Sequence, residues 1–193
     1  MLLCGEHDSS RMLYHALTQR FGEVAVVQEE RVSRLKLLRG RLRRQGILAV
    51  LGQVLFIMLV QPWLRWRASG RVTSLVREHS VSVAPIPSVL PVSSVNSEEA
   101  RRLLQMLQPR LVVVNGSRII SRSTLRAAEC PLLNTHAGIT PCYRGVHGGY
   151  WALAEKRPDL VGTTVHYVDE GIDTGGVIAR RFFPVTREDS FAT

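Results

Sequence analysis

An amide, an imidazole and a carboxylate occur together in the stretch Leu132–Ile178. Asn134 and His136 are separated by one residue, so on an extended strand their side chains lie on the same face. Asp173 follows in a turn-rich loop, Asp-Glu-Gly-Ile-Asp-Thr-Gly-Gly. An amide N–H or a protonated imidazole can stabilise an oxyanion, and a carboxylate can hold the imidazole charged or accept a proton from an amine. These residue types therefore suit acyl transfer to an amine.

The same residues also have a purely structural interpretation. Asn-x-His is a common tripeptide, and an aspartate in a glycine-rich loop usually serves the turn. From spacing alone, the catalytic and the structural interpretations of Asn134, His136 and Asp173 both stay open.

The three cysteines indicate neither disulfides nor covalent catalysis. Cys4, Cys130 and Cys142 are widely spaced, odd in number and form no Cys-x-x-Cys pair, which favours a reducing compartment. Cys142 lies near the motif, but nothing beside it in the sequence would activate it as a nucleophile. No Ser or Cys elbow occurs, so direct attack by an amine is favoured over a covalent intermediate. Asp, Cys and His are not grouped at ligand spacing, so we expect no metal.

Strand-like and helix-like segments alternate along the chain. Strands are predicted at Leu2–Gly5, Val24–Val27, Val81–Ile86, Leu111–Val114, Leu132–Asn134, Thr163–Val168 and Val177–Phe183. Helices are predicted after a cap at Asp8 or Ser9, and over Ser97–Gln108, Ser121–Ala128 and His147–Lys156. This alternation predicts an α/β fold with a doubly wound, mostly parallel sheet, in which ligands bind at the carboxyl ends of the strands. Asn134, His136 and Arg118 fall at such ends, whereas GxGxxG and GxxxxGK[ST] loops are absent from the sequence.

The motif region resembles the folate-dependent formyltransferase family, which includes glycinamide ribonucleotide, methionyl-tRNA and amino-sugar formyltransferases and the related formyltetrahydrofolate hydrolases. The resemblance rests on the Asn-x-His, a Pro-x-Tyr-x-Gly loop at Pro141–Gly145, a Gly-Thr-Thr-x-His strand at Gly162–His166 and an Asp-x-Gly at Asp173–Gly175. Val113–Ile120 resembles, more weakly, the strand and loop that hold the pterin. The resemblance implies a Rossmann-like formyltransferase fold and an enzyme that uses 10-formyltetrahydrofolate as formyl donor.

The resemblance also implies roles for individual residues. Asn134 would bond the formyl oxygen, His136 would stabilise the developing oxyanion, and Asp173 would orient His136 and assist proton transfer. Donor contacts are expected from Arg118, Ile119, Ile120, Val168, Asp169, Glu170 and Gly171. Substrate contacts are expected from Gly5, Ser9, Ser10, His147 and His166. Helix capping by His147 and simple burial of His166 in a strand are the competing interpretations.

The first loop departs from the family, which bears on the acceptor. Gly5–Ser10 is not the Gly-Ser-Asn type of loop, and Glu6 and Asp8 would repel a phosphate, which disfavours glycinamide ribonucleotide. A small amine is favoured, such as an amino sugar on a nucleotide or lipid carrier. Two alternatives remain: a hydrolase that releases formate, with water in place of the amine, and a non-catalytic membrane-peripheral protein that retains the pocket.

The positive charge is concentrated in one segment. The chain carries +9, but residues 31–71 hold ten Arg or Lys and no acid, while the rest holds 15 basic and 16 acidic residues. Nucleic acid is therefore not favoured as a partner. Within the segment, the apolar run Ile47–Leu64 is flanked by Arg and Trp, as at an interface with anionic lipid. A helical hairpin packed on its own domain, an interfacial membrane contact and a true span are all open.

We expect one catalytic domain over residues 1–193, with residues 31–71 as an insertion. Val185–Thr193 lacks the helix expected to cover the last strand, so a C-terminal truncation is one interpretation. The apolar run Met1–Cys4 ends at Gly5 and Glu6 and is too short for the apolar region of a secretory signal. This predicts a cytoplasmic protein, which would be membrane-peripheral if the insertion binds lipid. The sequence indicates no particular oligomeric state.

Overall fold

The computed structural model describes residues 1–31, 42–43 and 45–190, which fall into two units. The sheet unit consists of Met1–Glu30 and Val81–Val185. The helical arm consists of Arg31–Ser80 and Thr186–Thr193. The basic, apolar segment and the catalytic motifs therefore belong to different units.

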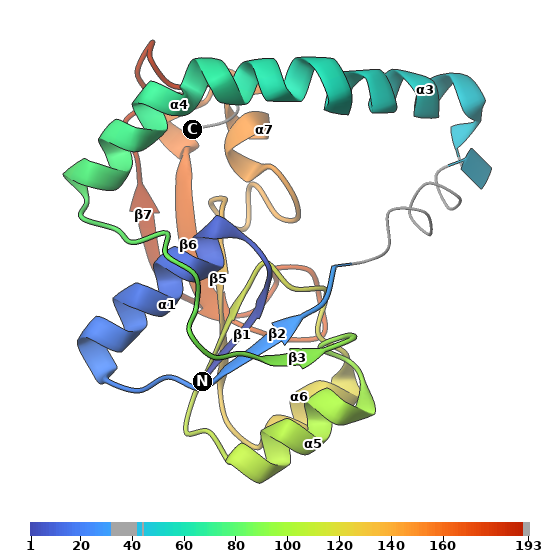
Figure 1. Cartoon of the computed structure of the whole chain (residues 1–193), viewed down its shortest axis with the longest axis vertical. Helices are drawn as coiled ribbons and strands as arrows, with labels where there is room; N and C mark the ends of the chain where they lie inside the picture. The colour runs from blue at the N-terminus through green and yellow to red at the C-terminus, as the bar shows by residue number, and fades with distance from the viewer. Residues whose placement is uncertain (32–41, 44, 191–193) are drawn as a thin grey trace. The chain divides into compact units, whose positions relative to one another are not determined.

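A seven-stranded sheet in the order β3-β2-β1-β4-β5-β6-β7 organises the sheet unit (Figure 1). Its strands are β1 Leu2–Gly5, β2 Val26–Glu29, β3 Leu90–Val92, β4 Val112–Asn115, β5 Leu132–His136, β6 Gly162–Tyr167 and β7 Val177–Phe182. Its helices are α1 Asp8–Phe21, α5 Glu98–Leu107, α6 Arg122–Ala128, α7 Gly148–Ala154 and the 3-10 turn η2 Pro158–Leu160. The strands from β3 to β5 pair in parallel, and β6 and β7 add antiparallel pairs. The predicted doubly wound, mostly parallel α/β sheet is confirmed.

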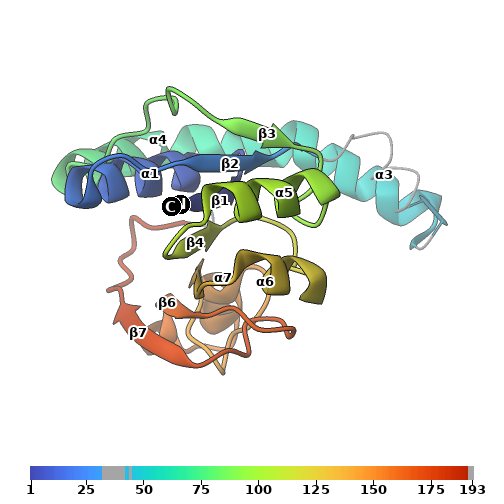
Figure 2. The same ribbon diagram turned by 90° about the horizontal axis from the view of Figure 1, so that it is seen from below.

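Helices cover both faces of the parallel part of the sheet. On one face, Leu3 belongs to a core with Leu104 of α5 and Ala128 of α6, the two helices that lie side by side in Figure 2. On the other face, Leu2 packs with Leu13 of α1. Successive residues of β1 thus point to opposite cores, as expected for a central strand buried on both sides.

The strand predicted at Val81–Ile86 is wrong. These residues have no regular structure, and the strand of this region is β3, Leu90–Val92, at the edge of the sheet. Pro85 and Pro87 lack the N–H groups that a strand needs for its ladder. Pro91 is tolerated within β3 because an edge strand has one side without a partner.

The predicted starts of α5 and α6 agree with the structure, and that of α1 does not. Ser97 caps α5 by accepting from the N–H of Ala100, and Ser121 caps α6 by accepting from the N–H of Thr124. The cap predicted at Asp8 or Ser9 is wrong, because α1 begins at Asp8 and His7 is its N-cap residue. Asp8 instead places its charge in the first turn, where the helix dipole favours an acid.

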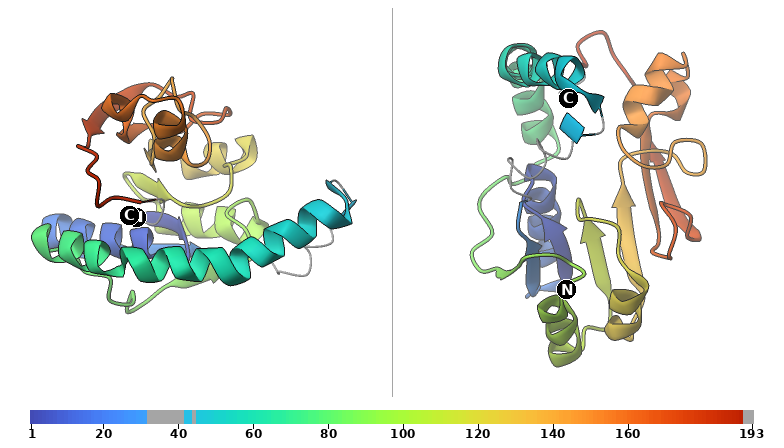
Figure 3. Two further views of the ribbon diagram at one scale, coloured as in Figure 1. Left: turned by 90° about the horizontal axis from the view of Figure 1, so that it is seen from above. Right: turned by 90° about the vertical axis from the view of Figure 1, so that its right-hand side faces the viewer.

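The helical arm contains one long helix, so the helical hairpin, one of the three alternatives, is wrong for its described residues. Within its described residues, α3 (Ile47–Leu55), the π-helical turn η1 (Phe56–Val60) and α4 (Gln61–Glu78) follow without a break, as the left panel of Figure 3 shows. The wider π turn accommodates Pro62, which cannot donate to the turn before it. Judged by length and composition, this helix could cross a membrane.

Candidate functional site

One carboxylate, that of Asp173, joins the two strands that carry the motif. Asn134 of β5 pairs directly with His166 of the antiparallel β6. Asp173 Oδ1 lies 3.1 Å from Asn134 Nδ2 and 3.3 Å from His166 Nε2, and its Oδ2 lies 3.4 Å from His136 Nδ1. Asn134 and His136 thus share a face of β5, and both point to the carboxylate.

Each imidazole has one nitrogen that faces a backbone carbonyl. His136 Nε2 is 2.7 Å from the carbonyl oxygen of Tyr143, so this nitrogen donates, and the other nitrogen, Nδ1, faces Asp173. His166 Nδ1 is 2.7 Å from the carbonyl oxygen of Tyr167, so it donates there. The Nε2 of His166 lies 3.2 Å from Asn134 Nδ2 and 3.3 Å from Asp173 Oδ1.

Close packing holds the His136 ring in place. Its side chain is 7% exposed. A Cβ added at Gly138 would come within 2.6 Å of His136 Nε2 and 2.5 Å of the Tyr143 carbonyl oxygen. Gly138 is therefore needed for the contact between His136 and Tyr143, a role that the sequence analysis missed.

The conformation of Asp173 is set by its loop. Its φ of +51° lies in the left-handed region, which aspartate tolerates better than most residues. The backbone N–H of Gly145 donates to Asp173 Oδ2 over 2.8 Å, which ties the Pro141–Gly145 loop to the carboxylate. The side chain is 13% exposed, so a water-restricted carboxylate accepts from an amide and a backbone N–H and lies beside two imidazoles.

Asn115 connects the first loop to the motif strands. It ends β4, beside β1, where the strand order reverses and open α/β sheets bind their ligands. Its Nδ2 donates to Ser9 and Ser10, and its Oδ1 accepts from Thr135 over 2.8 Å. The Ser10 side chain is 1% exposed, so it positions Asn115 instead of presenting its hydroxyl on the surface.

A buried glutamate anchors the loop that was predicted to hold the donor. Glu29, 6% exposed, accepts from the backbone N–H of Val95 over 2.9 Å and from that of Arg118 over 3.0 Å. The Arg118 guanidinium lies 3.4 Å from the same carboxylate. The sequence analysis missed Glu29, although an acid at the end of an apolar strand is a detectable signal.

Asn96 holds the same loop from the other side. Its Nδ2 donates to the carbonyl of Ile119 over 2.8 Å, and its Oδ1 accepts from the N–H of Ser121 over 2.7 Å. The Ile120 side chain is buried in the core, so at that position only the backbone is presented to a ligand. Glu29 and Asn96 together fix the backbone of residues 118–121.

The second loop predicted to bind the donor is joined to the first. Glu170 forms a two-pronged ion pair with Arg122, and this pairing lowers the pKa of the Glu170 carboxyl. Asp169 shapes its own turn by accepting from the N–H of Gly171 and the hydroxyl of Thr174. Val168 donates its N–H to the carbonyl of Leu132.

Each of the two loops also has an exposed aliphatic side chain. Ile119 is 59% exposed on the first loop, and Ile172 is 53% exposed on the second. Ile120 of the first loop belongs to the core cluster against which Val168 of the second packs. The two segments predicted to contact the donor are therefore joined through that cluster and through the Arg122–Glu170 ion pair.

Two further predicted residues, Gly5 and His147, lie at the ends of elements. Gly5 is buried at the end of β1, where a Cβ would come within 2.3 Å of the Gly116 carbonyl oxygen, so the two strands need a glycine there. His147 is the N-cap residue of α7, with a φ of +62°. Cys142 is exposed. Among the described residues, no group of three or more His, Cys, Asp or Glu could hold a metal ion.

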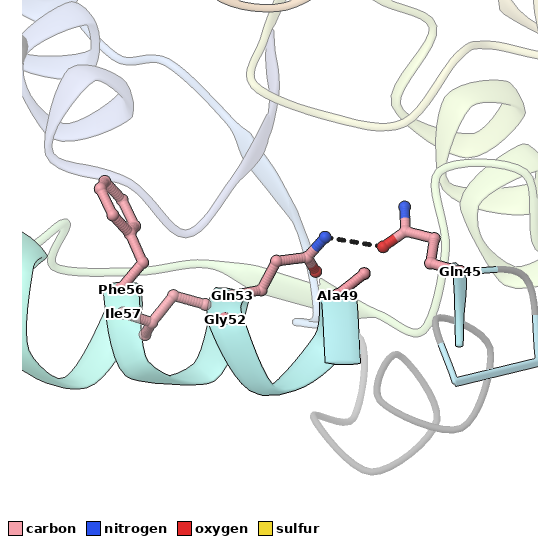
Figure 4. Close-up of a pocket in the computed structure, with 6 residues that line it drawn as sticks. All are labelled: Gln45, Ala49, Gly52, Gln53, Phe56 and Ile57. Atoms are coloured by element: carbon pink, nitrogen blue, oxygen red, sulfur yellow. Dashed lines mark hydrogen bonds between the residues drawn. The ribbon is translucent and has the colours of Figure 1, made fainter. Parts of the chain in front are cut away.

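The structure also has an open hollow on the helical arm, lined by Gln45, Ala49, Gly52, Gln53, Phe56 and Ile57 (Figure 4). Gln53 Nε2 donates to Gln45 Oε1 over 2.6 Å across it. These residues all come from the arm, so the hollow contains no part of the Asp173 centre.

Comparisons with known proteins agree with this geometry. The formyl transferase family model matches residues 65–193, which include Asn134, His136 and Asp173. Methionyl-tRNA formyltransferase of Koribacter versatilis (strain Ellin345) is 30% identical over 125 residues, which cover 64% of this chain and 39% of the relative. This chain thus matches about two fifths of that relative's length.

Solved structures share the fold at low identity. The phosphoribosylglycinamide formyltransferase from Streptococcus pneumoniae TIGR4 has a TM-score of 0.59 at 19% identity, covering 98% of this chain and 84% of its own. A formyltetrahydrofolate deformylase from Pseudomonas syringae pv. tomato has a TM-score of 0.55 at 17% identity, covering 98% and 52%. With the family model matching most of its length and containing the Asp173 centre, this chain belongs to the formyl transferase family.

Proposed function

We propose that this protein transfers the formyl group of 10-formyltetrahydrofolate to the primary amine of a small substrate. The observation that carries the proposal is the contact of one carboxylate, Asp173, with both Asn134 and His136. An amide donor and an imidazole beside one carboxylate suit direct attack by an amine on a formyl carbon.

Each of the three groups has a role that follows from its partners. His136, whose Nδ1 lies 3.4 Å from Asp173, stabilises the negative charge that develops on the formyl oxygen. Asn134 reaches the same oxygen by exchanging its bond to His166 for a bond to the substrate. Asp173 accepts the proton that the amine loses.

The bonds and protons of the reaction balance without a further reactant. A bond forms between the amine nitrogen and the formyl carbon, and the bond from that carbon to the donor nitrogen breaks. The proton lost by the amine passes by way of Asp173 to the donor nitrogen, and tetrahydrofolate leaves. The reaction is neither an oxidation nor a reduction.

The charge of the sheet unit supports a small acceptor. Residues 1–30 and 81–185 hold 13 Lys or Arg and 13 Asp or Glu, so this unit has no excess of positive charge for a polyanion. Arg118 and Arg122 are paired with Glu29 and Glu170. An amino sugar on a nucleotide, or a glycinamide ribonucleotide-like amine, is the acceptor class we favour.

The proposal is tested by following tetrahydrofolate release from 10-formyltetrahydrofolate, with and without candidate amines. We expect release that depends on an amino-sugar nucleotide or a similar small amine. Release without any amine would replace the proposal with a hydrolase, and release only with methionyl-tRNA would replace the small acceptor. No release by folded protein with any acceptor would overturn formyl transfer altogether.

A further inference from the structure

Large apolar side chains form an exposed stripe along the arm helix. They are Leu48, Leu51, Leu55, Leu59, Trp63 and Trp66. Their spacing of three or four residues keeps neighbours on one side of a helix. The least exposed of them, Leu55, is 49% exposed and the most exposed, Leu48, is 85% exposed. An exposed apolar surface of this length marks a contact with another partner or phase.

Around the π turn, the apolar surface is wider than the stripe. All five residues of Phe56–Val60 are exposed, from 39% for Val60 to 67% for Met58. Consecutive residues point in different directions around a helix. A second copy of this helix would cover only a narrow seam, whereas a lipid phase covers the whole apolar sector.

The charge of the arm complements an anionic surface. Residues 31–77 contain eleven Arg or Lys and no acidic residue. Arg65 and Arg67 stand on either side of Trp66, and the Arg67 guanidinium lies 5.0 Å from the centre of the Trp63 ring. Tryptophan next to arginine, at the end of an apolar stretch, is the arrangement found at the level of lipid head groups.

Two amides interrupt the apolar run of the helix. At 3.6 residues per turn, Gln53 and Gln61 fall away from the stripe, beside apolar residues such as Ile57, and Gln53 bonds to Gln45 (Figure 4). A helix that spans a bilayer would bury these amides in hydrocarbon, which is costly. The uninterrupted apolar run between them, Val54–Val60, is far shorter than the roughly 20 residues of a span, which favours a contact at the interface.

We propose that the arm helix binds the surface of anionic membranes, with the stripe in the boundary between head groups and acyl chains and the arginines on lipid phosphates. This surface is independent of formyl transfer, because it uses no residue of the Asp173 centre. It would hold the enzyme where a lipid-linked substrate is found.

The test measures co-sedimentation of the whole protein with vesicles of phosphatidylglycerol mixed with phosphatidylcholine, and with vesicles of phosphatidylcholine alone. We expect binding to the mixed vesicles only, weakened by added salt because salt screens the arginines. The double variant Leu55→Glu, Leu59→Glu should bind at least about tenfold more weakly, since it puts two charges in the stripe.

A matched control adds the same charge elsewhere. Phe21 and Met106 of the sheet unit are 73% and 70% exposed, so the double variant Phe21→Glu, Met106→Glu makes an equal change outside the arm. It should bind the mixed vesicles like the unaltered protein. If both double variants lost vesicle binding equally, net charge alone would govern binding, and the proposed role of the stripe would be refuted.

Fluorescence separates the remaining outcomes. In a Trp151→Phe background only Trp63 and Trp66 emit, and their emission should shift to shorter wavelength with the mixed vesicles. If the unaltered protein forms dimers, the stripe variant does not, and neither binds vesicles, then the stripe contacts a second copy of the chain and the proposal is overturned. If salt and alkali leave the protein on the vesicles and only detergent removes it, the helix spans the bilayer and the interfacial contact is overturned.

Discussion

Gly145 donates its backbone N–H to Asp173 Oδ2 over 2.8 Å, so the loop that follows Pro141 is attached directly to the carboxylate of the β6–β7 connection. The other close partners of Asp173 are Asn134 Nδ2 and the rings of His136 and His166. Both oxygens of Asp173 are therefore contacted by donors. The two halves of the motif meet at this one side chain.

Asp173→Asn should remove most of the activity while the fold persists. An amide in this position must turn its NH2 group toward either the Gly145 N–H or the Asn134 NH2, and both are donors. The variant also removes the negative charge beside His136. We expect a fall in turnover of about 10²-fold or more, measured as amine-dependent tetrahydrofolate release.

Asp159→Asn is the control for that change. Asp159 is exposed and paired with Arg157 at the surface, so its replacement should leave turnover unchanged. Circular dichroism should show the same secondary structure for both variants. Near-normal turnover in Asp173→Asn would show that Asp173 is not part of the reaction.

Gly138→Ala should disturb the position of His136. The added methyl group would lie within 2.6 Å of His136 Nε2, which is closer than packed atoms approach, so the ring or the loop must move. We expect turnover to fall about tenfold or more, because a small misplacement of a catalytic group is costly.

Gly149→Ala provides a matched comparison for Gly138→Ala. A Cβ at Gly149 would meet only Val161 Cγ1, at the ordinary distance of 3.7 Å. This variant should therefore keep its turnover and its melting temperature. If both alanine variants behaved alike, close packing at Gly138 would not explain the position of His136.

Glu29→Gln should weaken binding of the formyl donor. Glutamine keeps one acceptor oxygen but presents an NH2 group where Glu29 accepts from the N–H of Val95 or Arg118, so one buried donor loses its partner. The expected cost is about 1–3 kcal/mol of folding stability. The KM for 10-formyltetrahydrofolate should rise more than kcat falls, since the loop and not the Asp173 centre is disturbed.

Glu30→Gln is the control, because it changes the neighbouring glutamate, which is exposed. It should leave KM, kcat and the unfolding midpoint unchanged. A Glu29→Gln variant that unfolds earlier in denaturant yet keeps a normal KM would show that Glu29 supports the fold without positioning the donor loop.

The sequence was informative where neighbouring residues decide the structure. The apolar run at Leu111–Val114 predicted β4, and the helices predicted from Ser97 and Ser121 match α5 and α6 within a residue or so, because the signals for these elements are local. The spacing of Asn134 and His136 predicted their common face for the same reason. The prolines in the region of β3 gave a loop signal, so β3 was not predicted. Its position depends on pairing with β2.

Long-range contacts could not be read from the sequence. Glu29 and Arg118 are far apart in the chain, and only the sheet order brings the end of β2 beside the loop after β4. The contact of His166 with Asp173 likewise depends on the antiparallel register of β5 and β6. The sequence left a packed hairpin, an interfacial helix and a span open for the arm, and the structure has one continuous helix in which a π turn precedes Pro62.

Cys4 should make the stability of the protein depend on alkaline pH. Cys4 lies on β1 and packs against α1. This burial raises the pKa of its thiol from 9.0 to about 11, and a hydrogen bond with Ser10 opposes the rise. The unfolded chain therefore loses this proton at a lower pH than the folded chain. Its contribution to stability is intact below the unfolded value and is lost as the pH rises toward the folded value.

Urea unfolding of the unaltered protein and of Cys4→Ala, compared at several pH values, measures this effect. Alanine cannot titrate, so its stability should fall less steeply than that of the unaltered protein between pH 9.0 and about 11. A thiol reagent at neutral pH should modify the exposed Cys142 and spare the buried Cys4. Identical slopes for the two proteins would mean that Cys4 titrates alike in the folded and unfolded states, and rapid labelling of Cys4 would show that the core between β1 and α1 opens readily.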